Sequence, residues 1–461
     1  MTRRSRLIAL TVLAAVTLSG CATVGKINPF GGKSKHKEVA EGTRIDVVVA
    51  DQSLQVADTL KGADFFLPAP AAVDSWPLPG RSPEQSTENV AADLNLSVAW
   101  RHGFGEGSGR SAHVTAPPIM ADGKIFVMDG EARVSAIDAK SGHQVWRTDM
   151  RPTEDKRDKQ AFGGGLAYAD GKVYVSSGYR LVAQLDASSG AVGWRTRTEQ
   201  PVHAAPTAVA GRVMVVSIDN TLLTFDAASG APGWNYQALT EPARLIGASS
   251  PAVSGDTVVA SFGSGELVAL HVANGNDLWN EALSRASRTN ALSEIRDIPG
   301  RPVIYQGDVF AVSHSGVLAA TDLRTGQARW TLPVVGMTSP LPAGDVVYVV
   351  AKSGQVICAA RESGLIYWIQ DLNAAVKKGK KKGGFLGVGA RRTTRPLWSS
   401  PLLVNNQLLV AGTTGEMVSL NAKTGAVDRR VKLGSSVLIG PIAAGGTVYV
   451  VTDKADLIAL R

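Results

Sequence analysis

The chain has 461 residues, of which 44% are hydrophobic and 19% are charged, so it is long and apolar enough to bury a large core. Its formal net charge is +8, but three arginines lie within the first six residues and eight further bases lie between residues 377 and 395. The rest of the chain is close to neutral, which argues against a nucleic-acid groove spread over the fold.

The first twenty residues have the features of a bacterial lipoprotein signal peptide. Residues 1–6 are basic, and the apolar run from Leu7 to Leu18 is too short to span a bilayer comfortably. Small residues then lead to Cys21, as in a lipobox, so we expect cleavage after residue 20 and lipidation of Cys21. The alternative is a plain secretory signal followed by a chance cysteine. Ala22 is not aspartate, which in similar Gram-negative lipoproteins favours sorting to the outer membrane.

Residues 21–93 lack the repeat pattern that organises the rest of the chain. A lysine-rich stretch at 33–37 is followed by a proline-rich stretch at 68–79. Such a composition is typical of a linker, so the sequence predicts a flexible tether over residues 21–93.

A nine-residue frame recurs through the remainder of the chain. An aspartate, replaced in some copies by another residue, is followed four positions later by glycine and four positions after that by tryptophan. Six copies carry the tryptophan: Asp138-Gly142-Trp146, Asp186-Gly190-Trp194, Asp226-Gly230-Trp234, His271-Gly275-Trp279, Asp322-Gly326-Trp330 and Ala360-Gly364-Trp368. A seventh copy, Asn421-Gly425-Arg429, keeps only the glycine. The spacing is typical of the blades of a β-propeller.

Each unit contains four short apolar segments separated by turn residues, as expected for a four-stranded antiparallel blade. Eight first strands are predicted, beginning near Ala116, Gly164, Ala205, Ser250, Arg301, Ser339, Ser400 and Gly440. The last unit stops at Arg461 without a fourth strand, whereas residues 95–101, with Trp100, resemble a fourth strand without a blade. The sequence therefore predicts an all-β, eight-bladed propeller over residues 94–461, closed by an N-terminal strand that completes the last blade.

The residues of the repeated frame have structural roles in this interpretation. Large aromatic side chains usually pack in cores, so the tryptophans are expected between neighbouring blades. The aspartates are expected to form turns, because an Asp side chain bonds the backbone that follows it. Cys358 lies in an apolar strand and is expected to be buried and inert.

A basic insertion over residues 374–396 contains the run Lys377 to Lys382 and the pair Arg391-Arg392, with several glycines between them. A solvated loop is the simpler interpretation. The functional interpretation is attraction to anionic lipid or to an acidic partner surface.

Signals of catalysis are weak. The histidines do not form a zinc-binding motif, no cluster of acids stands out, and residues 103–109 are glycine-rich but open no helix. We therefore expect no catalytic residues, no metal site and no cofactor, and predict that the protein is not an enzyme.

The units from about Asn95 to Arg461 resemble the repeat of quinoprotein alcohol dehydrogenases (PQQ-like repeat). Together with the lipobox and two connections between units, they resemble the BamB family of outer-membrane protein assembly factors. The resemblance implies a non-catalytic scaffold lipoprotein, anchored in the outer membrane at its periplasmic face. It further implies binding to the POTRA domains of BamA, alongside other assembly-machinery lipoproteins, and a role in inserting outer-membrane proteins.

Two stretches carry the implied contact with BamA. Arg244, Leu245 and Ile246 align with a family Leu-Arg pair: Leu245 matches, whereas Ile246 stands where arginine is expected and Arg244 lies nearby. Arg296 and Asp297 align with a family loop that bears two acids; Asp297 matches one of them and Pro299 falls on the other.

The strand topology predicts the same partner-binding surface independently of the family resemblance. In a four-stranded meander, second-to-third turns and fourth-to-next-first connections lie on one face. The longest connections, 151–163, 235–247, 280–300 and 372–396, are all of the latter type. Binding usually resides in such elaborated loops, so the partner site is predicted on this face. Two alternatives stay open: a PQQ-dependent periplasmic dehydrogenase, and a propeller scaffold of another envelope complex.

Overall fold

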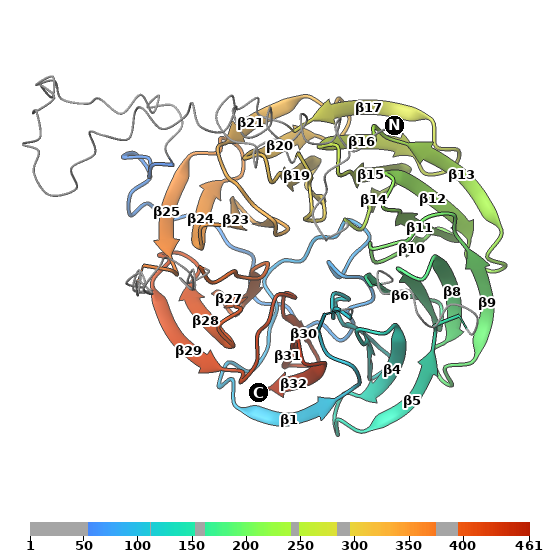
Figure 1. Cartoon of the computed structure of the whole chain (residues 1–461). Coiled ribbons are helices and arrows are strands. Elements are labelled where there is room, and N and C mark those ends of the chain that lie inside the picture. The colour runs from blue at the N-terminus through green and yellow to red at the C-terminus, as the bar shows by residue number, and fades with distance from the viewer. Residues whose placement is uncertain (1–53, 111, 153–161, 241–248, 284–295, 375–394) are drawn as a thin grey trace, which may run out of the picture. The chain divides into compact units, whose positions relative to one another are not determined.

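In a computed structural model, the described residues are 54–110, 112–152, 162–240, 249–283, 296–374 and 395–461. They form thirty-two β-strands, and none of them is helical. The strands make eight four-stranded antiparallel sheets, arranged around a common centre as the blades of a propeller (Figure 1). The predicted fold class is thereby confirmed.

Each of the first four blades runs outward through four consecutive strands. Blade 1 contains β2 (Ile119–Ala121), β3 (Lys124–Met128), β4 (Arg133–Asp138) and β5 (Gln144–Asp149). Blade 2 contains β6 (Gly164–Ala169), β7 (Lys172–Ser177), β8 (Leu181–Asp186) and β9 (Val192–Arg197). Blade 3 contains β10 (Thr207–Val209), β11 (Arg212–Val216), β12 (Thr221–Asp226) and β13 (Pro232–Gln237). Blade 4 contains β14 (Ala252–Ser254), β15 (Thr257–Ser261), β16 (Glu266–His271) and β17 (Asp277–Ala282).

Blades 5 to 7 follow the same plan, and blade 8 differs only in its outermost strand. Blade 5 contains β18 (Val303–Tyr305), β19 (Asp308–Val312), β20 (Leu318–Asp322) and β21 (Ala328–Leu332). Blade 6 contains β22 (Leu341–Ala343), β23 (Val346–Val350), β24 (Gln355–Ala360) and β25 (Ile366–Asp371). Blade 7 contains β26 (Leu402–Val404), β27 (Gln407–Ala411), β28 (Glu416–Asn421) and β29 (Val427–Lys432). Blade 8 contains β30 (Ile442–Ala444), β31 (Thr447–Val451), β32 (Asp456–Leu460) and β1 (Val98–Gly103).

The ring closes by pairing the first described strand with the last. β1 runs antiparallel to β32, with Val98 opposite Leu460 and Gly103 opposite Asp456. Ser97 and Arg461 exchange two backbone hydrogen bonds just beyond this ladder, at 2.8 and 3.0 Å. The predicted closure is confirmed, and it removes the free edge that an incomplete last blade would leave.

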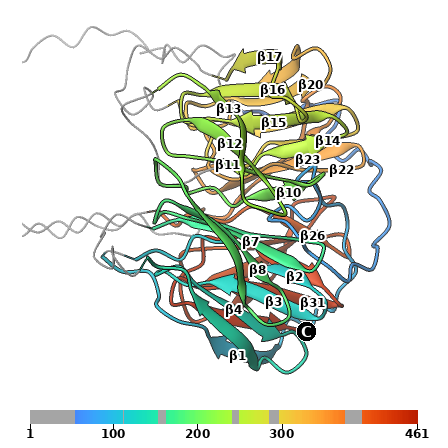
Figure 2. The same ribbon diagram turned by 90° about the vertical axis from the view of Figure 1, so that its right-hand side faces the viewer.

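A proline-rich segment, residues 66–93, lies across the centre of the ring (Figure 1) and at one side of it (Figure 2). We call it the plug segment. In every blade, the plug segment forms a hydrogen bond with a residue of the first strand, of the second strand or of the turn between them. These residues are Met120, Tyr168, Thr207, Val253, Ile304, Asp345, Leu403 and Gly446. The plug segment therefore ties all eight blades together from one face of the propeller.

The plug segment corrects the expectation of a flexible tether over residues 21–93, which is wrong for residues 54–93. Trp76, Leu78 and Val90 are each at most 2% exposed and form part of the core. Proline suits such an extended path, because its missing N–H needs no partner and its carbonyl can still accept, as Pro77 does from Tyr168 at 2.7 Å. Residues 21–53 lie outside the described residues, as do the signal peptide and Cys21.

The tryptophans of the repeat join neighbouring blades, as predicted. Each lies on an outermost strand, covers the glycine of the next blade's third-to-fourth turn, and donates its indole N–H to a backbone oxygen of that turn. The acceptors of Trp100, Trp146, Trp194, Trp234, Trp279, Trp330 and Trp368 are Ala139, Ala187, Ala227, Val272, Leu323, Arg361 and Ala422, at 2.7 to 3.3 Å.

Arg429 replaces tryptophan at the one junction that has no such turn. The next blade is blade 8, whose outermost strand is β1, so no turn glycine follows β32. The guanidinium of Arg429 instead donates to the backbone oxygens of Leu94 and Asn95, at 3.0 and 3.1 Å. The departure from the repeat thus marks the junction at which the ring closes.

The aspartates of the repeat form turns, as predicted. The carboxylate of Asp226 accepts hydrogen bonds from the N–H and the hydroxyl of Ser229, at 2.8 and 2.7 Å. These bonds, the hydroxyl's first, lower the pKa of Asp226. Cys358 is fully buried, and burial raises the pKa of its thiol, which disfavours the reactive thiolate.

Candidate partner-binding face

The face that carries the second-to-third turns and the fourth-to-next-first connections contains the predicted partner site. The strand order confirms that the long connections follow the outermost strands of blades 1, 3, 4 and 6. Arg244, Leu245 and Ile246 lie outside the described residues. Arg296 and Asp297 are described, as are the ends of the connections on either side of blade 4.

One turn of blade 4 holds the ends of two connections. Residues 262–266, which we call the anchor turn, join β15 to β16. The turn is closed by hydrogen bonds from the N–H of Phe262 to the oxygen of Glu266 and from the N–H of Gly265 to the oxygen of Phe262, both at 3.0 Å. Gly265 has φ +84°, a conformation that favours glycine.

The connection from blade 3 to blade 4 is held to the anchor turn at both ends. At its start, the N–H of Leu239 donates to the Glu266 carboxylate at 2.7 Å. At its end, the hydroxyl of Ser261, just before the turn, donates to Ser249 at 2.6 Å. Glu266 is only 7% exposed, and its carboxylate also accepts hydrogen bonds from Ser264 and Asn280. These donors stabilise its negative charge.

The connection from blade 4 to blade 5 is held at the same place. The N–H of Leu283 donates to the oxygen of Gly265 at 2.8 Å, and the N–H of Ile298 lies 3.4 Å from the oxygen of Phe262. A side chain at Gly265 would come within 2.9 Å of Arg296. The two connections that bear the predicted contact residues therefore begin and end around one turn.

The two described contact candidates differ in exposure. Arg296 is exposed on this face. Asp297 is 4% exposed, and its backbone oxygen accepts the N–H of His314 at 2.8 Å, which joins it to the equivalent turn of blade 5. In this structure Arg296 is accessible to a partner, whereas Asp297 lies within the protein.

Three exposed apolar side chains lie on the same face, at the separate junctions that follow blades 3, 5 and 7. Leu239, Val335 and Leu438 are 67%, 42% and 47% exposed, and each lies shortly after an outermost strand. Of these three, Leu239 lies in one of the long connections, so it adds exposed apolar area to the predicted site. Their position in the repeat, just after the fourth strand, is the signal that could have identified them.

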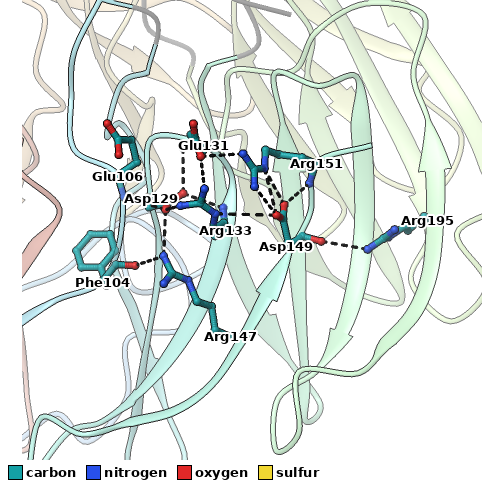
Figure 3. A network of polar contacts seen from close by, with 9 residues as sticks. All are labelled: Phe104, Glu106, Asp129, Glu131, Arg133, Arg147, Asp149, Arg151 and Arg195. Carbon is teal, nitrogen blue, oxygen red and sulfur yellow. Dashed lines mark hydrogen bonds and ion pairs between the residues drawn. The ribbon is translucent and has the colours of Figure 1, made fainter. Parts of the chain in front are cut away.

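A network of charges holds the corresponding connection of blade 1 (Figure 3). The side chain of Asp129, which is fully buried, accepts hydrogen bonds from the backbone of Glu106, Glu131 and Arg133 and pairs with the side chains of Arg133 and Arg147. Every polar atom of this carboxylate thus has a partner. Since a buried charge needs such pairing, the role of Asp129 is structural.

The outer part of the network fixes the first residues after β5. Arg151 pairs with Asp149 at 2.6 Å and with Glu131 at 2.8 Å. Burial alone would raise the pKa of Asp149, but the hydrogen bonds and charge of Arg151 hold it below its ordinary value. At blades 1, 3 and 4, therefore, the start of a long connection is bonded to a second-to-third turn.

Comparison with known proteins identifies the family. A family profile described as "Outer membrane protein assembly factor BamB" matches residues 88–156, 130–370 and 382–461. The chain belongs to the BamB family.

Curated relatives of the family cover most of both chains. The outer membrane protein assembly factor BamB of Salmonella typhimurium is 25% identical over 405 residues, which is 87% of this chain and 95% of the relative. That of Alkalilimnicola ehrlichii is 30% identical over 374 residues, which is 81% of this chain and 90% of the relative.

Solved structures agree with the fold. BamB from Moraxella catarrhalis superposes with a TM-score of 0.64 at 17% identity, over 79% of this chain and 99% of that one. Quinohemoprotein alcohol dehydrogenase from Comamonas testosteroni superposes with a TM-score of 0.65 at 14% identity, over 85% of this chain and 81% of that one. Since a BamB protein and an alcohol dehydrogenase share this fold, the propeller by itself does not decide between their functions.

The described part of this BamB-family chain shows no group of three or more His, Cys, Asp or Glu residues placed to hold a metal. Within the same residues, no helix is long and apolar enough to cross a membrane. What the described face offers is exposed apolar side chains, a free cationic group at Arg296 and rigidly held loop ends, which suit the binding of another protein.

Proposed function

We propose that this protein is a non-catalytic scaffold lipoprotein of the outer-membrane β-barrel assembly machinery. It would be attached by lipid on Cys21 to the periplasmic face of the outer membrane and would bind the POTRA domains of a BamA-like barrel protein. The observation that carries this proposal is the anchor turn, which gathers the ends of both connections that the family resemblance assigns to partner contact.

The rigidity of the loop ends and the exposure of the side chains beside them both favour partner binding. Loop ends fixed by hydrogen bonds lose little conformational freedom on binding, which favours affinity. Leu239 supplies exposed apolar area beside the anchor turn, and Arg296 supplies a cation. Leu245 completes the proposed contact set, with Arg244 and Ile246 beside it, and the buried Asp297 would act by holding the end of the connection between blades 4 and 5 in place.

The lipid anchor supports the same role. Two or more acyl chains on the residue-21 thiol and amine anchor stably where one would not. Residues 22–53 lie between Cys21 and the first described residue, 54. Other lipoproteins of the machinery would share this location.

Affinity purification of the full-length protein from solubilised outer membranes tests the proposal. Wild-type protein should recover a BamA-like barrel protein, and Leu245→Ala, Leu239→Ala and Asp297→Ala should each reduce the recovered amount. Leu365→Ala is the matched control, because Leu365 is 49% exposed but lies in a third-to-fourth turn on the opposite face. Thermal unfolding of each variant separates lost contact from lost fold, which matters for the buried Asp297.

Three outcomes distinguish the alternatives. Unchanged recovery with all three variants would contradict the placement on this face. Recovery of a different envelope complex, with no barrel protein, would support a scaffold of another assembly. Quinone-dependent dye reduction by the purified protein would support a PQQ-dependent dehydrogenase, which shares the fold with the Comamonas testosteroni enzyme.

A further inference from the structure

The innermost strands of the eight blades surround a central shaft (Figure 1), and one position of the repeat forms a ring around it. This position lies seven residues before the first residue of each second strand. It is occupied by Pro117, Gly165, Ala205, Ser250, Arg301, Ser339, Ser400 and Gly440. Seven of these residues are small or carry no charge; Arg301 alone is long and cationic.

Space at the ring is limited where small residues occur. A side chain on Gly165 would come within 2.4 Å of the Cβ of Ala205. Ser339 and Ser400 use their hydroxyls to accept the backbone N–H groups of Arg301 and Ser339, at 2.9 and 3.1 Å. Most of the ring is therefore built for close packing and backbone bonding, and Arg301 is the exception to be explained.

Two cavities meet at Arg301. The smaller, of about 60 Å³, is bounded on one side by Trp76, Gln85 and Thr87 of the plug segment. The larger, of about 280 Å³, lies on the other side of the ring and is lined by Phe162, Lys352 and Trp398 among others. Arg301 lines both, so its side chain lies in the shaft rather than against the outer surface.

The charge of Arg301 has no counter-ion among the described residues. None of the residues that line the two cavities is Asp or Glu. The side chain takes part in none of the ion pairs found in the described chain, and its Nε is buried without a hydrogen-bond partner. Burial of this kind lowers the pKa of the Arg301 guanidinium to about 10, because desolvation disfavours the charged form.

Two further groups in the larger cavity can act as donors. The Nζ of Lys352 lies 2.7 Å from the Nε2 of His314 and adds a second cation. The hydroxyl of Thr115 is buried without a hydrogen-bond partner. The remaining walls are largely apolar, with Val114, Phe162 and Trp398.

We propose that the larger shaft cavity binds a small organic monocarboxylate. Its carboxylate pairs with the guanidinium of Arg301, which matches carboxylate geometry with two parallel N–H groups. Its apolar part contacts Phe162 and Trp398. A volume of about 280 Å³ suits a ligand of roughly ten heavy atoms, near the lower end of small-molecule sites. This site is independent of the proposed assembly role.

A phosphate group fits less well than a carboxylate. It carries more charge and more acceptor oxygens than a monocarboxylate, and the hydroxyls of Thr338, Ser339 and Ser400, which also line the cavity, are already bonded to the backbone. An apolar wall next to the remaining oxygens would leave them without partners, which is costly.

Calorimetric titration of the full-length protein tests the proposal with benzoate and hexanoate as probes. Benzamide, which has the same ring without the charge, and inorganic phosphate are the comparison ligands. We expect both carboxylates to bind and benzamide not to bind. Arg301→Met should weaken benzoate binding at least about ten-fold, because it removes the charge-assisted pair, and Lys352→Met should weaken it less.

Arg430→Met is the matched control, since Arg430 lies on the outermost strand of blade 7, far from the shaft in the blade order. In the absence of any probe, Arg301→Met should raise the melting temperature, because a partly buried cation without a counter-ion becomes an apolar side chain. That rise also shows that the variant folds. The proposal is overturned if benzoate fails to bind wild-type protein, if Arg301→Met binds it equally well, or if phosphate alone binds.

Discussion

The indole N–H of Trp279 donates to the backbone oxygen of Leu323 at 2.7 Å, while the same ring covers Gly326. Trp279 belongs to the outermost strand of blade 4, and Leu323 belongs to the turn between the third and fourth strands of blade 5. One side chain thus supplies both a buried apolar contact and a hydrogen bond across a blade junction. Because equivalent pairs occur at seven junctions, the stability of the ring is distributed evenly around it.

Gly326→Ala should destabilise the protein by more than the cost of its backbone conformation. Gly326 has φ +72°, and an added Cβ would lie 2.6 Å from the ring of Trp279. The strained backbone costs about 1 kcal/mol and the overpacking adds about 1–3 kcal/mol. The shift in the midpoint of denaturant-induced unfolding, relative to wild-type protein, measures the sum of these two costs.

Gly307→Ala is the control for that substitution. Gly307 has φ +84°, but a Cβ there meets nothing within 4 Å, so only the cost of about 1 kcal/mol for the backbone is expected. Equal midpoints for the two variants would contradict the contact between tryptophan and glycine as a source of stability.

Removal of residues 54–93, which include the plug segment, should destabilise the ring, whereas removal of residues 1–53 should not. A chain that begins at residue 54 keeps every hydrogen bond from the plug segment to the blades. A chain that begins at residue 94 loses the buried side chains of Trp76, Leu78 and Val90. Each such side chain contributes about 2–3 kcal/mol when buried, so the loss is several kcal/mol. Thermal unfolding of the two truncated chains measures it; the same melting temperature for both would contradict the structural role of the segment.

The free energy of unfolding should fall between pH 10 and about pH 12, in part through Tyr305. Burial first, and then the hydrogen bond to Glu88, raise the pKa of Tyr305 to about 12. The folded protein holds this proton to a higher pH than the unfolded chain does, so unfolding above pH 10 releases it and rising pH favours unfolding. Tyr305→Phe should be less stable at pH 8, because the phenol also accepts the N–H of Gly344 at 3.0 Å. Its stability should depend less steeply on pH above 10, and an unchanged slope would contradict the assignment.

Glu266→Ala should release the start of the connection between blades 3 and 4. Its carboxylate accepts hydrogen bonds from the Leu239 amide, Ser264 and Asn280, all of which would lose a partner. Hydrogen exchange at the Leu239 amide should accelerate at least about ten-fold, the factor that corresponds to a hydrogen bond of roughly 1.5 kcal/mol.

Glu416→Ala is the matched control, because Glu416 begins the third strand of blade 7 as Glu266 does in blade 4. Among the described contacts, the carboxylate of Glu416 pairs only with Arg430, at 3.4 Å, and its side chain is 32% exposed. Exchange in the connection between blades 3 and 4 should be unaffected by it. Reduced partner capture by Glu266→Ala, without such a change in Glu416→Ala, would link the anchor turn to binding.

The sequence by itself determined the features that depend on neighbours along the chain. The spacing of Asp226, Gly230 and Trp234 reports a turn followed by a strand, and its repetition gives the number of blades. The missing fourth strand after Leu460 and the unpaired strand around Trp100 predict the closure, since both carry the same local pattern. These features are readable because one structural unit recurs with little change.

Only the tertiary structure decided the features that depend on the closed ring. The plug segment has no periodic pattern, because it bonds to the blades mainly through its backbone, as Trp76 does to Met120 and Val90 to Leu403. Its side-chain contacts also join distant parts of the chain, since Glu88 and Tyr305 are 217 residues apart. The anchor turn likewise became visible only when blades 3, 4 and 5 were brought side by side. Arg301 occupies an ordinary place in the sequence pattern, and its isolation as a cation follows from the seven residues that closure places around it.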